Sequence, residues 1–99
     1  MIKINQKTNE TTLIMEIEGR LDTMTAPVFE AALKDAVDGV TELILDFAGL
    51  EYVSSAGLRV LLFAQKVMNR QGRMVIRNVG ETIKEVFNVT GFAGIMTIV

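Results

Sequence analysis

One stretch of the chain decides the fold: LILDFAGLEYVSSAGLR, residues 43–59. It opens with Leu43-Ile44-Leu45, a short and continuously apolar run between Glu42 and Asp46. Such a run predicts a central strand that is covered on at least one face. We expect this strand to end near Phe47, after which a loop leads to two consecutive serines. The stretch therefore predicts a strand, a loop and the start of a helix.

The rest of the chain alternates short strands and helices around this stretch. A helix should begin at Ser54 or Ser55, run to about Arg70 and stop at Gly72. Hydrophobic periodicity and turn residues predict the other elements. They are strands at 2–4, 12–18, 74–76 and 95–99, a loop at 19–24, and helices from Thr25 to Gly39 and from about Ile83 to Gly91. The order β-β-α-β-α-β-α-β predicts a single α/β domain, residues 1–99, with a mixed, mostly parallel sheet.

The composition excludes several classes of function. The 99 residues contain no Cys and no His, which excludes disulfides, thiolate metal sites, histidine phosphorelays and the usual general base. A net charge of −2 gives no electrostatic reason to bind nucleic acid or an anionic membrane. No run approaches the about 20 apolar residues of a membrane span, and no signal peptide is expected. We expect a cytoplasmic domain that binds no metal and no cofactor.

The paired serines carry the chemistry of the sequence. They lie where a helix begins, so unpaired N–H groups and the positive end of the helix dipole face their side chains. Gly57, in the first turn, is expected to let another molecule approach the backbone closely.

Three interpretations of the serines are open. In the first, a serine merely caps the helix. In the second, a serine is the nucleophile of a hydrolase, but the Gly-x-Ser-x-Gly elbow is absent and no His can take the proton. In the third, a serine accepts a phosphoryl group from a separate kinase, which supplies its own base.

The same residues resemble a known family. Leu43–Phe47 followed by Tyr52–Leu58 resembles the signature of STAS domains, and specifically of the anti-sigma factor antagonists. Gly19–Thr23 with Thr25-Ala26 resembles the second motif of that family, and Thr90–Phe92 resembles the third. The resemblance covers essentially the whole chain, with the three motifs in the correct order. It implies a STAS fold.

The resemblance also implies partner switching. The phosphorylated hydroxyl corresponds to Ser55, with Ser54 as the other possible acceptor. The unmodified protein would bind a cognate anti-sigma factor, a serine kinase with a histidine-kinase-like ATP-binding fold, and so release the sigma factor. Phosphorylation would dissociate the complex, and a PP2C-type phosphatase would restore the active form. The domain itself would catalyse nothing and would be a monomer when free.

Two acidic residues are expected beside Ser55. Asp22 and Asp46 each end or follow a strand that leads to this edge, and either could simply cap a turn or a helix. The resemblance implies that Asp22 contacts the kinase or its nucleotide environment, and its neighbour Thr23 is expected to contact the partner as well. We expect a structural role for Asp46.

The helix after the serines is expected to supply further partner contacts, together with Ser54 and Gly57. Leu58 and Leu62 fall among the polar residues of its outer face. Either a neighbouring element covers both leucines, or they form an exposed apolar patch that docks a partner.

A second function remains open. STAS relatives also serve as accessory subunits of lipid or anion transport systems, where they bind a permease or an ATPase and need not be phosphorylated. A pull-down that recovers a membrane ATPase and no kinase-like anti-sigma factor would favour this alternative.

Overall fold

The chain forms one five-stranded sheet and three α-helices in a computed structural model that describes residues 1–99. The elements are β1 (Ile2–Asn9), β2 (Thr12–Leu21), α1 (Ala26–Ala36), β3 (Glu42–Val53), α2 (Ser55–Gln71), β4 (Arg73–Arg77), α3 (Glu81–Thr90), a 3₁₀ turn (Phe92–Gly94) and β5 (Thr97–Ile98). The predicted order β-β-α-β-α-β-α-β is confirmed, with the 3₁₀ turn as an addition. None of the helices is long and apolar enough to cross a membrane.

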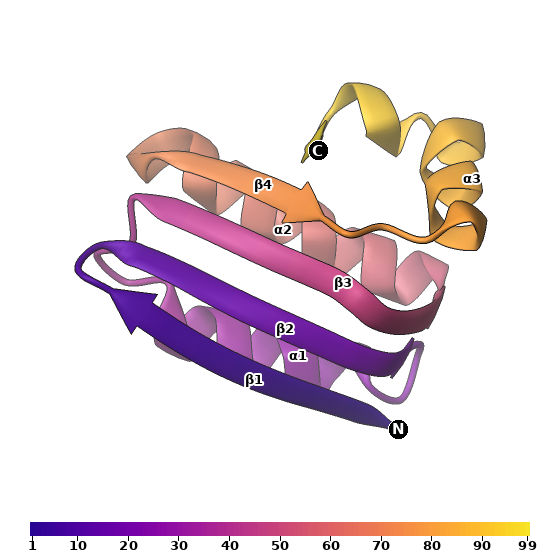
Figure 1. The fold of residues 1–99 in the computed structure, drawn as a ribbon, viewed down its shortest axis with the longest axis horizontal. Coiled ribbons are helices and arrows are strands. Elements are labelled where there is room, and N and C mark those ends of the chain that lie inside the picture. The colour runs from indigo at the N-terminus through magenta and orange to yellow at the C-terminus, as the bar shows by residue number, and fades with distance from the viewer.

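The strands lie in the sheet in the order in which they occur in the chain. β1 is antiparallel to β2, and β2, β3, β4 and β5 are successive parallel neighbours, so the predicted mixed, mostly parallel sheet is confirmed. A helix connects each parallel pair, and right-handed crossovers between neighbouring strands put α1 and α2 on one face. Figure 1 shows α1 and α2 behind the sheet.

The core lies between the sheet and the helices. Alternate residues of β2 point into it, and this explains the alternating pattern of that segment. The largest fully buried side chains come from the strands and from all three helices. They are Phe29, Phe47, Phe87, Leu13, Met15, Ile17, Leu21, Leu33, Leu43, Leu45, Leu61 and Met68.

The two central strands are longer than predicted. β2 continues through the expected loop to Leu21, and β3 continues past Phe47 to Val53. Their extensions pair with each other after two register shifts, bringing Leu21 opposite Val53. The predicted strand ends were wrong because Gly19 and Gly49 are residues typical of turns. In the structure, each strand extension supplies the hydrogen-bond partners of the other. The paired extensions carry both strands to the edge where α2 begins.

Candidate functional site

The two serines have different structural roles at the start of α2. The backbone N–H of Ser54 donates to the carbonyl oxygen of Leu21 at 2.8 Å, which ties the end of β3 to the end of β2. Ser54 Oγ accepts a hydrogen bond from the backbone N–H of Gly57 at 3.3 Å, so Ser54 is the N-cap of α2. Ser55 is the first residue of the helix, and it is exposed. The capping interpretation is therefore confirmed for Ser54 and leaves the Ser55 hydroxyl free.

Gly57 faces the interior of the protein. A Cβ at this position would lie 2.7 Å from Leu21 Cγ and 3.0 Å from Val53 Cγ2. The glycine is buried and allows α2 to pack closely against the ends of β2 and β3. The expectation that it exposes backbone to another molecule is wrong, because the close approach is within the chain.

Leu58 also belongs to the interior. Its side chain is only 7% exposed and is part of the hydrophobic core. The structure contradicts the exposed-patch alternative for this residue, because the first turn of α2 is enclosed where it meets the two strand ends. Leu62, one turn further, is only half-buried. Its proposed contact with a partner stays a prediction.

Asp22 organises the loop between β2 and α1. Its Oδ1 accepts hydrogen bonds from the backbone N–H groups of Met24 at 3.0 Å and Thr25 at 3.1 Å. The hydrogen bond from the Thr25 backbone lowers the pKa of Asp22 below its ordinary value. Its other oxygen, Oδ2, lies 3.8 Å from Arg20 Nε. The carboxylate of Asp22 thus stabilises the loop, as expected if its role is structural. The proposed contacts of Asp22 and of the exposed Thr23 with a partner stay predictions.

Asp46 has the structural role that was predicted, at a different place. It is 8% exposed, and it accepts hydrogen bonds from Ala48 N–H, Arg77 Nε and Asn78 Nδ2, each at 3.0 Å. Burial alone would raise the pKa of Asp46, but these hydrogen bonds together lower it. The expectation that it lies beside Ser55 is wrong, because β3 continues from Asp46 to Val53 before α2 begins. At about 3.3 Å per residue, less the bulges, this part of the strand is roughly 20 Å long.

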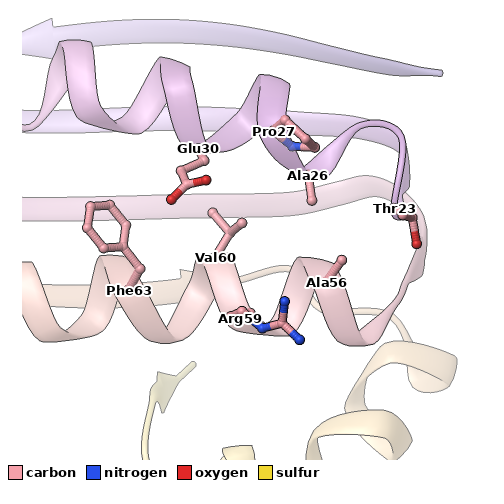
Figure 2. Close-up of a pocket in the computed structure, with 8 residues that line it drawn as sticks. All are labelled: Thr23, Ala26, Pro27, Glu30, Ala56, Arg59, Val60 and Phe63. Atoms are coloured by element: carbon pink, nitrogen blue, oxygen red, sulfur yellow. The ribbon is translucent and has the colours of Figure 1, made fainter.

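A groove between α1 and α2 opens beside the first turn of α2. Its volume is about 320 Å³. Figure 2 shows that α1 forms one wall and α2 the other. The lining residues are Thr23, Ala26, Pro27, Glu30, Ala56, Arg59, Val60 and Phe63. The groove therefore combines an apolar surface with one acidic and one basic side chain.

Sequence reasoning predicted the loop before α1 but missed this groove and the exposed apolar side chains next to it. Met24, in the loop before α1, is 83% exposed, and Val28 on α1 is 54% exposed. An apolar Met in a turn was the one available signal in the sequence. The groove itself needs two helices to pack side by side, and no local pattern contains that information. No group of three or more His, Cys, Asp or Glu residues is arranged to hold a metal ion.

Comparison with known proteins gives concordant matches. A family model described as the STAS domain matches residues 3–99. A protein named putative anti-sigma factor antagonist BtrV, from Bordetella bronchiseptica, is 33% identical over 99 residues, which cover 98% of this chain and 85% of that protein.

Two solved structures share the fold. An anti-sigma factor antagonist from Mycobacterium paratuberculosis superposes with a TM-score of 0.90 at 20% identity, covering 99% of this chain and 85% of that one. The Bacillus cell fate determinant SpoIIAA in its phosphorylated form superposes with a TM-score of 0.76 at 22% identity, covering 98% and 91%.

Proposed function

The chain belongs to the STAS domain family, and from this membership we propose that it is an anti-sigma factor antagonist that phosphorylation of Ser55 switches off. The unphosphorylated form binds a cognate anti-sigma factor, a serine kinase with a histidine-kinase-like fold, and the sigma factor is released. Phosphorylation by that kinase ends the interaction, and a PP2C-type phosphatase reverses it. The name of the relative from Bordetella bronchiseptica supports the antagonist function.

The observation that carries this proposal is the free hydroxyl of Ser55. Ser55 is an exposed residue at the start of α2, whereas Ser54 is half-buried and its hydroxyl oxygen accepts the capping hydrogen bond from Gly57 N–H. A kinase must surround the acceptor oxygen, and phosphorylation of Ser54 would also displace the cap, which is worth about 1 kcal/mol. Ser55 is therefore the better acceptor.

The same surroundings favour binding over catalysis. The chain has no His, and Asp22, the carboxylate of the adjacent loop, already accepts hydrogen bonds from Met24 and Thr25. A serine nucleophile needs a base within hydrogen-bond reach. A phospho-acceptor needs none, because the kinase supplies it.

The partner surface that we propose surrounds Ser55. It comprises Thr23 and Met24 from the loop before α1, the groove between α1 and α2, and the half-buried Leu62. An exposed Met beside an apolar groove suits contact with apolar side chains of a partner, since interface cores are enriched in Met and aromatic residues. Leu58 and Gly57 are buried beneath this surface.

The switch acts through charge at the interface. A phosphate adds about −1.5 to −2 charges and three acceptor oxygens to Ser55. At a helix N-terminus such a charge is favourable by about 0.3–1 kcal/mol, so the fold of the free protein is retained. In the complex the dianion must lose its water against the partner, and each increment of about 1.4 kcal/mol lowers the affinity tenfold.

Reconstitution with the purified cognate kinase and ATP tests the proposal. Affinity capture from lysate of the source organism, with and without ATP, identifies that kinase. Peptide mapping should then place the phosphate on Ser55 in the wild type and in Ser54→Ala, and should find none in Ser55→Ala. A phosphate mapped to Ser54 would refute the assignment, and recovery of a membrane ATPase without any kinase would refute the function.

A further inference from the structure

We propose that Arg59 is the internal counter-ion of the phosphate on Ser55. The proposal rests on the proposed function, because it concerns the phosphorylated state of the same site. It adds a residue that holds the phosphate within the chain. Arg59 is then a positioning residue of the switch.

The geometry of α2 puts Arg59 within reach of Ser55. The two residues are four positions apart, so they lie on the same side of the helix with Cβ atoms about 5–6 Å apart. Side chains in a helix tilt toward its N-terminus, which brings the residue at i+4 back over the residue at i. Figure 2 shows the Arg59 guanidinium extending along the helix toward Ala56, the neighbour of Ser55.

Arg59 is also available for a new partner. It is exposed, and it takes part in none of the five ion pairs of the chain. Glu30, which lines the same groove from α1, is paired with Lys34 instead, at 3.6 Å. The planar guanidinium matches phosphate oxygens in a bidentate fashion. A dianion one helical turn away is therefore a strong acceptor for Arg59.

Other charged groups lie around this end of the molecule. Glu30 faces the groove from α1, and Asp22 lies in the loop between β2 and α1 beside Arg20. The amino group of Met1 is close enough to Asp22 to lower its pKa slightly. All of these groups are the same in a wild-type protein and in an Arg59 variant. A comparison of the two therefore isolates the contribution of Arg59.

The pairing has two consequences for the switch. It partly neutralises the phosphate and holds it against the helix, so a phosphatase must displace Arg59 to reach it. It also withdraws the one cation that lines the groove beside Ser55. Phosphorylation then changes two features of the partner surface, namely the hydroxyl of Ser55 and the charge at the edge of the groove.

The test uses protein in which phosphoserine is incorporated at position 55 during translation, so that it does not depend on a kinase. The second pKa of the phosphate, ordinarily about 6, is measured by ³¹P NMR titration. We expect Arg59→Gln to raise this pKa by about 0.15–0.4 unit, which is the roughly 0.2–0.5 kcal/mol of an exposed i, i+4 ion pair converted at about 1.36 kcal/mol per pKa unit, and Arg59→Lys to restore part of the difference. Added salt should shrink the difference.

Lys66→Gln is the matched control. Lys66 is exposed on the same helix and nearly the same face, but it is eleven residues from Ser55, or about 16 Å at 1.5 Å per residue. That distance exceeds the Debye length of about 10 Å at 0.1 M salt, so this variant should leave the phosphate pKa unchanged. Equal pKa values in wild type and Arg59→Gln, or equal shifts in both variants, would overturn the proposal.

The outcome is separable from that of the proposed function. If no kinase phosphorylates Ser55 in reconstitution, the function fails while the pKa difference in the installed phosphoserine remains. If the kinase modifies Ser55 but Arg59→Gln leaves the phosphate pKa unchanged, the function stands and the counter-ion proposal fails.

Discussion

Ser54→Ala and Ser55→Ala should differ in stability, although the two serines are neighbours. Ser54→Ala removes the hydroxyl oxygen that accepts the hydrogen bond from Gly57 N–H, whereas Ser55→Ala removes an exposed hydroxyl at the first residue of α2. Loss of an N-cap lowers the free energy of unfolding by about 0.5–2 kcal/mol. The capping bond is long at 3.3 Å and Ser54 is only half-buried, so we expect a value near the low end, about 0.5–1 kcal/mol.

Thermal unfolding followed by circular dichroism measures this difference. For a domain of this size, about 1 kcal/mol corresponds to about 4–8 °C in Tm, so Ser54→Ala should lower the Tm by about 2–8 °C. Ser55→Ala should leave the Tm level or raise it slightly, because Ala has the higher helix propensity. Ser54→Thr, which keeps a capping oxygen, is the control and should recover most of the loss. Equal losses in the two alanine variants, or a larger loss in Ser55→Ala, would refute the division of roles.

Three further predictions follow from the same structure. Leu58→Ala should lower the free energy of unfolding by about 2–5 kcal/mol because the side chain is in the core, whereas Leu62→Ala should affect partner affinity more than stability; equal stability losses would contradict this. Asp22→Asn should keep near-wild-type stability, since its amide oxygen can still accept from Met24 and Thr25, and should weaken kinase binding by calorimetry; unchanged binding would leave Asp22 as a loop cap alone. The pKa of the Asp46 carboxylate is lowered, so its contribution to stability is present above the ordinary pKa of about 3.9 and is lost as the pH falls through the lowered value. Asp46→Asn should therefore remove this part of the acid dependence of stability, as measured by urea midpoints between about pH 2 and 6.

Much of the fold follows from local patterns in the sequence. Helix starts and stops depend on caps and glycines within a few residues, so α2 was predicted to within about one residue of Ser55 and Gln71. The length of β3 could not be predicted in this way. Ala48 and Gly49 resemble a loop locally, and only their pairing with the extended β2 makes them part of a strand.

The candidate site shows the same limit. The two serines were found from the sequence, but the sequence alone left open which of them caps the helix. Leu58 was placed among polar residues by a helical wheel, which treats a helix as isolated. In the structure the first turn packs closely on Leu21 and Val53 through Gly57, and this enclosure buries Leu58. Burial at a helix end depends on which other elements pack against it, and a local sequence pattern does not contain this tertiary information.

The central claim is that a phosphate on Ser55 changes the surface of this protein and leaves its fold intact. The most direct measurement is a comparison of backbone amide NMR spectra of the free protein with serine and with phosphoserine at position 55. We predict shifts confined to the first turns of α2, to the adjacent loop around Met24 and to the strand ends at Leu21 and Val53 that contact this turn, with the amides of β4 and of the rest of β2 and β3 unchanged. Large shifts spread through these strands would contradict the account and would show that the switch is conformational.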